Sequence, residues 1–288
     1  MIVSSDPFVT SGFRDPLRPR RKTRPFFWVI VAAVRTQTMQ LTKRLDGIDA
    51  LRGAAIVWMT LFHFCFDLNH AGFIRQDFYS DPFWTWQRSA IVSLFLFCAG
   101  LGQSVAVAQG QGWSHFWRRW SRVAGCAVLV TLGSLWMFPQ SFIYFGVLHA
   151  MALMLLLLRW MSPWARRQLL LLFLIGAVLI AAKFIAQQVM GSGALSDLLN
   201  QRGLNWLGLV NRKPNTEDYV PLVPWLGVML WGFVAGTWAQ RHYPQALRVR
   251  VATAFAPLTF LGRWSLSYYM LHQPVLIACV TLAGWVSG

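Results

Sequence analysis

The chain has 288 residues, of which 56% are hydrophobic and only 12% are charged, and its mean hydropathy is +0.46. A soluble globular domain carries about 25% charged residues, so the composition excludes that class and indicates an integral membrane protein. The net charge of +16 does not indicate nucleic-acid binding, because the basic residues lie in an N-terminal tail and in short loops between apolar segments.

The N-terminal segment, residues 1–38, differs from the rest of the chain because it is polar, proline-rich and basic. Its apolar run at 26–34 is too short to span a bilayer, which takes about 20 residues. We expect a disordered basic tail, followed by a single transmembrane domain over residues 39–288. An alternative is that translation starts at Met39.

The first transmembrane helix is expected at about 50–68, and it carries a stripe of ionisable side chains. Four such residues recur at intervals of three, eleven and four: Asp49, Arg52, His63 and Asp67. At about 100° per residue they share one face of a helix, with Arg52 and His63 about 16 Å apart along its axis. Ionisable groups that face lipid cost several kcal/mol, so the stripe should face protein or a water-filled cavity.

Six further apolar segments predict an all-α, polytopic helix bundle with seven transmembrane helices, or eight if a half-span at 251–262 is counted. The expected ranges are 90–108, 123–138, 142–160, 169–187, 222–238 and 265–286. The first of these contains the small-residue sequence CAGLG, which permits close contact between helices.

The four cysteines lie inside apolar segments: Cys65, Cys98, Cys126 and Cys279. They lack the spacing of metal ligands, so we expect small buried hydrophobic residues and no metal site.

The charge of the loops predicts the orientation. Basic residues dominate alternate connections: Lys43, Arg44, Arg118, Arg119, Arg122, Arg159, Arg166, Arg167, Arg241, Arg248, Arg250 and Arg263. The two long loops on the other side, 69–88 and 188–221, are mixed in charge. The positive-inside rule then places the N-terminus in the cytoplasm and the two long loops outside.

Three histidines lie inside the expected helices. His63 falls in the outer half of the first, where Asp67 one turn later could orient the imidazole as a general base. His149 is expected about seven residues into its helix, in the outer half, and His272 in the inner half of the last helix. All three could reach a common cavity, and the alternative for each is a hydrogen bond that joins two helices.

The surroundings of His272 have their own alternative reading. Pro274 frees a backbone carbonyl in the last helix, so Tyr269 and Gln273 could serve only to satisfy a kink.

Arg52 stands at the cytoplasmic mouth of the first helix. Its alternatives are snorkelling to the interface with Asp49 as partner and anchoring a phosphate-bearing group, for which the planar guanidinium is suited. Three more arginines lie on the same side: Arg118, Arg119 and Arg122. Positive-inside topology explains these three, and a surface for an anionic cofactor is the alternative.

The sequence contains no P-loop, dinucleotide-binding glycine pattern, HExxH motif or nucleophile elbow. This argues against nucleotide hydrolysis, NAD chemistry and zinc proteolysis.

Five fragments occur in an order that is similar to a known family: IDALRGAAIVWMTLFH, FLFCAGLG, FGVLH, DYVPLVPWLGVML and FLGRWSLSYYMLHQPVL. The chain resembles the short bacterial membrane proteins related to the catalytic domain of heparan-α-glucosaminide N-acetyltransferase, within the wider transmembrane acyltransferase superfamily. The resemblance runs from about Arg44 to Leu276.

This resemblance implies an enzyme of the bacterial cytoplasmic (inner) membrane that acylates an extracytoplasmic, sugar-type acceptor from cytoplasmic acetyl-CoA or another acyl-CoA. Arg52 would help to hold the acyl-CoA, and a histidine would act as base or transient acyl carrier. In the eukaryotic enzyme the implicated histidine lies beyond the first shared helix, which makes His70 a competitor of His63. We favour His63 for its stripe and for Asp67.

Three other functions compete with acyl transfer. A proton-coupled transporter would also use Asp and His in the membrane, a b-type cytochrome would ligate haem through histidines of two helices, and a structural subunit would need the histidines only for stability. The sequence does not identify the acceptor, the acyl chain length or the oligomeric state. A homo-oligomer is one of the states that it leaves open.

Overall fold

The computed structural model describes residues 45–189, 193–245 and 252–287. Its described residues form helices and connecting segments, with one isolated β-bridge between Phe145 and Tyr219. Among the described residues, seven helices are long and apolar enough to cross a membrane, which confirms the predicted number. They are α2 (Asp46–His70), α3 (Pro82–Ala108), α4 (Trp113–Met137), α5 (Val147–Ala165), α6 (Leu169–Val189), α8 (Leu222–His242) and α10 (Ser265–Ser287).

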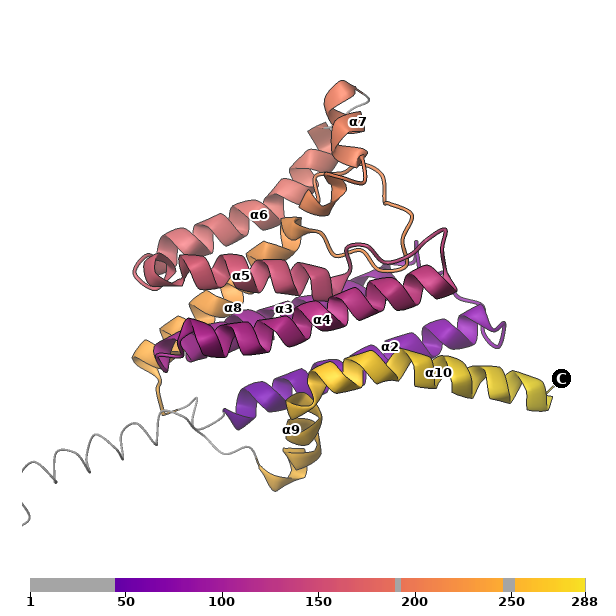
Figure 1. The fold of residues 1–288 in the computed structure, drawn as a ribbon, viewed down its shortest axis with the longest axis horizontal. Helices are drawn as coiled ribbons and strands as arrows, with labels where there is room; N and C mark the ends of the chain where they lie inside the picture. Colours follow the sequence, from indigo (N-terminus) through magenta and orange to yellow (C-terminus); the bar gives the residue numbers. More distant parts are fainter. Residues whose placement is uncertain (1–44, 190–192, 246–251, 288) are drawn as a thin grey trace, which may run out of the picture. The chain divides into compact units, whose positions relative to one another are not determined.

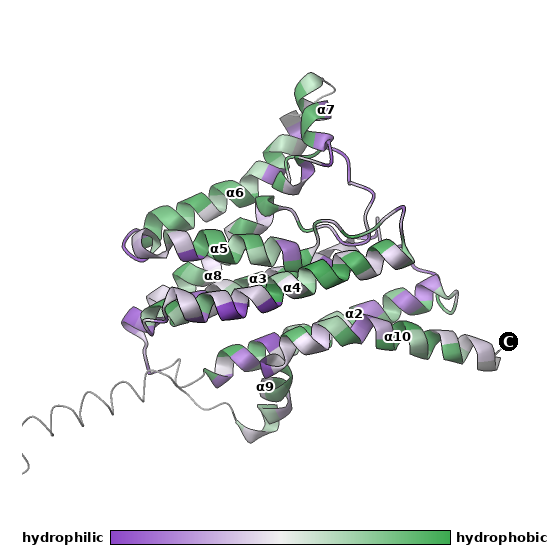
Figure 2. Cartoon of the chain, viewed as in Figure 1, coloured by the Kyte–Doolittle hydropathy of each residue, from purple (hydrophilic) through white to green (hydrophobic). Residues whose placement is uncertain are grey.

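Two short helices and two 3₁₀ turns complete the described fold (Figure 1). The helices are α7 (Ala194–Asn200) and α9 (Ala256–Arg263), and the turns are Asn205–Leu207 and Thr253–Phe255. Figure 2 shows α6 hydrophobic over most of its length, whereas hydrophilic residues interrupt α2. A helix that faces lipid needs no polar residues, so the hydrophilic residues of α2 indicate that one face of this helix is turned to protein or to a cavity.

The predicted start of three helices was wrong, and local hydrogen bonding accounts for two of the differences. α3 begins before the predicted residue 90, since Asp81 accepts a hydrogen bond from the Phe83 amide at 2.8 Å and caps the helix. α4 begins at Trp113, before the predicted residue 123, and has no side-chain cap. α5 begins after 142, because the Thr216 hydroxyl and the Val220 amide bond to backbone carbonyls in the segment before it.

Glycines bring α3 and α8 into close contact, as the CAGLG sequence predicted. A Cβ added at Gly100 of α3 would collide with the backbone of Met229 in α8. A Cβ at Gly232 of α8 would meet the backbone of Phe97 in α3 in the same way. Only glycine therefore fits at these two crossing points.

The predicted half-span is the short helix α9, which packs across the beginning of α2 (Figure 1). The contact is backbone to backbone, because Gly53 faces Leu258 and Gly262 faces Asp49 without room for a Cβ. Since α9 occupies the first turns of α2, α10 begins alongside the middle of α2. There the Thr60 and Tyr268 hydroxyls lie 3.0 Å apart.

The expected tail at residues 1–38 and the candidate start Met39 lie outside the described residues. So do the basic loop residues Lys43, Arg44, Arg248 and Arg250. The boundary between tail and transmembrane domain stays a prediction.

Candidate active site

The ionisable stripe of α2 faces other helices. Asp49 and Asp67 are buried, and Arg52 and His63 are half-buried. On the other side of α2, Leu61 is 59% exposed. The predicted division of α2 into a polar inner face and an apolar outer face is confirmed.

Arg52 points between α2 and α3 and is held there by fixed contacts. Its guanidinium donates to the Cys98 carbonyl at 3.3 Å and lies 3.5 Å from a carboxylate oxygen of Asp49. Gly102 of α3 leaves the room that this guanidinium needs, since a Cβ there would be only 2.5 Å from a guanidinium nitrogen. Asp49 also faces Arg263, with 3.7 Å between Oδ2 and Nε. Asp49 thus positions Arg52 and joins it to the end of α9.

A cavity of about 230 Å³ opens beside Arg52, between α2, α3, α4, α5 and α10. Four arginines line it: Arg52, Arg119, Arg122 and Arg159. None of the described residues that line it is acidic. The cavity, called the arginine cavity below, is therefore suited to phosphate groups, for which guanidinium is the preferred protein partner.

The structure brings together only some of the residues that the sequence suggested for anion binding. Arg119 and Arg122 lie on α4 and not in a loop, and both reach the arginine cavity. Arg118 is exposed and lies outside its lining, with a guanidinium nitrogen 3.5 Å from Nδ1 of His115. Asp49 is likewise not part of the lining and acts on Arg52.

Two lining residues were not recognised as site residues from the sequence. Arg159, at the end of the expected helix 142–160, was counted only with the basic residues of the following connection, but it lies on α5 and donates to the Gln111 carbonyl at 2.5 Å. Gln103 is buried, and its amide nitrogen has no hydrogen-bond partner among the described residues. A buried donor without a partner is costly, so Gln103 marks a place for a polar ligand. An arginine and a glutamine between apolar residues were the signals available in the sequence.

His63 and His272 form a pair on α2 and α10, with 5.2 Å between their ring centroids. The prediction that His272 lies at a different depth was wrong, because α9 shifts the start of α10 along α2. Nδ1 of His272 lies 2.6 Å from the Tyr269 carbonyl, and Tyr269 lines the arginine cavity. A carbonyl only accepts, so Nδ1 carries the proton and Nε2 presents a lone pair.

The pair has two polar atoms without partners. Nε2 of His272 and Nδ1 of His63 are both buried and lack a hydrogen bond to any described residue. Such groups are uncommon in native structures and are typical of catalytic or ligand-binding positions.

The expected hydrogen bond between Asp67 and His63 is replaced by another. Both carboxylate oxygens of Asp67 accept from the side-chain amide of Gln273, at 2.9 and 3.2 Å. Gln273 therefore does more than satisfy a kink at Pro274, because it ties α10 to α2. The sequence could not show this, since the two residues meet only through the packing of helices far apart in the chain.

His149 lies apart from this pair. It is in the first turn of α5, whereas the sequence placed it about seven residues into the helix. Its Nδ1 accepts from the Gly146 amide at 3.3 Å, and its Nε2 lies 3.0 Å from the Thr131 hydroxyl, whose proton goes to Ile143. Both ring nitrogens are satisfied, so His149 caps α5 and joins it to α4.

His70 is exposed in the last turn of α2. It stands one turn beyond Asp67, outside the contact between the rings of His63 and His272.

At the end of the bundle where α5 begins, a network of polar side chains covers the helix ends. Asp218 accepts from the Val147 amide at 2.8 Å, and burial raises the pKa of its carboxyl. The Tyr219 hydroxyl donates to the Asn205 carbonyl at 2.6 Å, and the Asn205 amide donates to the Tyr144 hydroxyl at 2.7 Å. This network fixes the long loop before α8 over the bundle.

No group of three or more metal-ligating side chains is present in the part of the chain that the structure describes. A comparison with curated proteins finds no match, and neither does a comparison with solved structures. The family model described as heparan-alpha-glucosaminide N-acetyltransferase, catalytic, matches residues 44–274. The match includes the stripe of α2, the arginine cavity and the histidine pair. The chain therefore belongs to this family of membrane acetyltransferases.

Proposed function

We propose that the protein is an acetyltransferase that uses acetyl-CoA from the cytoplasm and acylates a sugar-type acceptor on the extracytoplasmic side of the membrane. The observation that carries this proposal is the adjacency of the arginine cavity and the histidine pair. Tyr269 lines the cavity, and its carbonyl orients His272, which packs on His63. An anionic carrier and a base are the two requirements of acyl transfer from a CoA thioester.

The arginine cavity fits the phosphates of an acyl-CoA. Four arginines and no acidic residue are among its described lining residues, Asp49 contacts Arg52 from outside the lining, and the Gln103 amide offers one more donor. Arg52, Arg119 and Arg122 bind the phosphates in this proposal, and Asp49 holds Arg52 in place. Arg118, which lies outside the lining, does not contact the phosphates in this proposal.

The histidine pair supplies the base. An unpartnered ring nitrogen of His63 or His272 takes the proton from the acceptor hydroxyl or amine. The oxygen or nitrogen of the acceptor then bonds to the thioester carbonyl carbon. The carbon–sulfur bond breaks, and the CoA thiolate leaves and takes the proton that the histidine accepted. Asp67 positions His63 indirectly, because its bond to Gln273 fixes α10 against α2.

The topology of the proposal follows the charge of the loops. The arginine-rich end of the bundle faces the cytoplasm of a bacterial cell, where acyl-CoA is present, and the N-terminus lies on the same side. The acceptor approaches from the end where α5 and α8 begin, past the segment between α2 and α3 and the segment before α8. The transmembrane domain from residue 39 onward holds the whole site.

The experiment compares the wild type with Arg122→Gln, His63→Ala and His272→Ala, each purified and given radiolabelled acetyl-CoA. We expect the wild type to bind the label and release CoA, Arg122→Gln to bind weakly, and the histidine variants to bind normally and release little. Arg118→Gln is the matched control for charge, since this exposed arginine lies outside the cavity.

A transporter is the second candidate, because Asp67, His63 and His272 gather between two helices as in a proton relay. Wild-type protein that binds no acetyl-CoA but moves protons into vesicles would replace the first proposal with this one. Label that stays on the protein would assign an acyl-histidine instead of simple base catalysis.

A further inference from the structure

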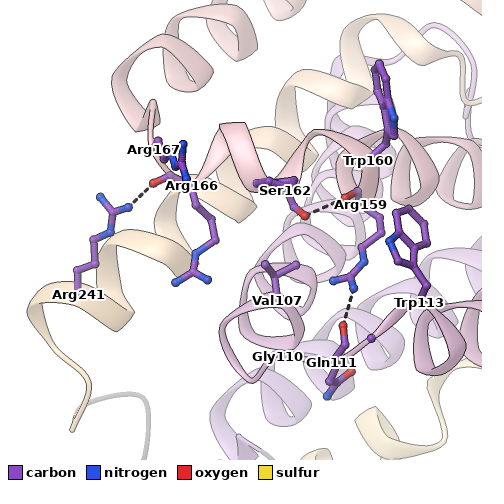
Figure 3. A pocket seen from close by; sticks show the side chains of 12 residues that line it. Val107, Gly110, Gln111, Trp113, Arg159, Trp160, Ser162, Arg166, Arg167 and Arg241 are labelled. Carbon is purple, nitrogen blue, oxygen red and sulfur yellow. Dashed lines mark hydrogen bonds between the residues drawn. The ribbon is translucent and has the colours of Figure 1, made fainter.

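A second cavity, of about 620 Å³, lies at the same end of the bundle as the arginine cavity. It is formed where α3 and α5 end, where α4 begins and where α8 ends. Figure 3 shows Arg166 and Arg241 on one side of it and Arg159 with Trp113 on the other. Arg159 also lines the arginine cavity, so the two spaces share one wall.

The lining of this second cavity is strongly basic. Four arginines contribute to it: Arg159, Arg166, Arg167 and Arg241. No acidic residue is among the described residues around it. The Arg241 guanidinium donates to the backbone carbonyl of Arg166, and this bond neutralises neither charge. Four like charges around one space repel each other unless an anion binds between them.

Tryptophans at the same helix ends indicate the depth of the cavity in the membrane. Trp160, in its lining, is 76% exposed, and Trp164 and Trp238 nearby are 41% and 48% exposed. Exposed tryptophans of transmembrane helices lie at the level of the lipid headgroups. The arginines of the second cavity are thus at the level of lipid phosphates.

We propose that the second cavity binds the phosphate of an acidic phospholipid headgroup. A lipid is favoured over a soluble phosphate compound because the cavity opens among exposed tryptophans, where the membrane supplies headgroups at high local concentration. The arginines form charge-assisted hydrogen bonds to the phosphate.

Bound lipid would also help to hold Arg159. This side chain lies over the rings of Trp113 and Phe116, 5.2 and 5.9 Å from their centroids, between the two cavities. An anion in the second cavity adds a partner to its free edge. The lipid site goes beyond acetyl transfer and does not depend on it.

The test is retention of phosphatidylglycerol by the full chain after transfer from phosphatidylglycerol-containing vesicles into detergent, without acetyl-CoA. The bound lipid is counted by mass spectrometry. We expect the wild type to retain about one molecule and Arg166→Gln/Arg167→Gln to retain about tenfold less. The matched control Arg118→Gln/Arg212→Gln loses the same charge at exposed positions and should retain lipid like the wild type.

A parallel arm adds inorganic phosphate or CoA in excess, which distinguishes a lipid site from a site for soluble phosphate. Equal retention by the double variant and the control, or displacement of the lipid by phosphate or CoA, would overturn the proposal. A single Arg241→Gln variant, with the same expected loss, replaces the double variant if that one does not fold. Because no acetyl-CoA is needed, failure of acetyl transfer leaves this result unchanged.

Discussion

The carboxylate of Asp67 accepts two hydrogen bonds from the side-chain amide of Gln273 and thereby links α2 to α10. Both residues stand one turn or less from the facing rings of His63 and His272. The link holds the two rings at a common level, so it bears on the stability of the bundle and on the geometry of the pair.

We expect Gln273→Ala to lower the free energy of unfolding by about 1–3 kcal/mol, because the buried Asp67 carboxylate loses its partner. Thermal unfolding in detergent measures the change. Asp67→Asn combined with Gln273→Ala should recover part of the loss, since a neutral amide costs less to bury than a carboxylate. Exposed Gln168→Ala is the control, and an equal loss there would contradict the assignment.

From the contact between His63 and His272 we predict which histidine substitutions lower the rate of acetyl transfer. His63→Ala and His272→Ala should each reduce the rate of acetyl transfer by about 10²–10⁴-fold while acetyl-CoA binding is retained. His70→Gln should leave both quantities near the wild type. Steady-state kinetics separates the effects on kcat and KM, and a loss confined to His70→Gln would move the base to the end of α2.

His149 should behave as a structural residue. We expect His149→Ala to destabilise the protein by about 1 kcal/mol or more, because the Gly146 amide loses its acceptor and the Thr131 hydroxyl oxygen loses the donor Nε2. The specific activity of the fraction that stays folded should not change. A loss of turnover without a change in thermal unfolding would give His149 a role in catalysis.

Gly102→Ala tests the position of Arg52 without touching its charge. The added methyl group would displace the guanidinium, so we expect acetyl-CoA affinity to fall by about tenfold. Thermal stability should hold or rise, since alanine favours a helix by up to about 1 kcal/mol. Gly133→Ala on α4, which meets nothing within 4 Å, is the control. Unchanged affinity in Gly102→Ala would remove Arg52 from the binding site.

We expect Asp218 to make the stability of the protein depend on pH. Burial raises the pKa of its carboxyl, so over the range between the two pKa values the folded protein binds more protons than the unfolded chain. The free energy of unfolding contributed by Asp218 therefore falls as the pH rises through that range. Thermal unfolding of the wild type and Asp218→Asn at several pH values isolates this contribution.

Asp77 is the control of opposite sign for that experiment. Amide hydrogen bonds from Ser80 and Tyr79 hold the pKa of its carboxyl below the ordinary value, so its contribution is lost as the pH falls. Equal pH profiles for Asp218→Asn and the wild type would contradict the burial of an ionisable Asp218.

Hydropathy and spacing were sufficient to predict the seven spans and the inward face of α2. Both follow from the cost of placing a charged side chain in lipid, and this cost can be read from the sequence because it depends only on each residue and its neighbours along the chain. The depth of His272 was not predictable, because it depends on α9 crossing α2 through Gly53 and Gly262, a contact between distant segments. Helix packing also creates the bond from Gln273 to Asp67 and places Arg159 in the lining of both cavities, so these two features were not predictable either.

The short helix α9 also has an electrostatic consequence. By filling the beginning of the bundle, it places the first turn of α10 alongside the middle of α2, and Ser265 and Leu266 of that turn line the arginine cavity. The first backbone N–H groups of a helix have no partner within it and carry a partial positive charge. In the proposed function, part of the attraction for the phosphates thus comes from the main chain itself, and no side-chain substitution at the arginines would abolish it.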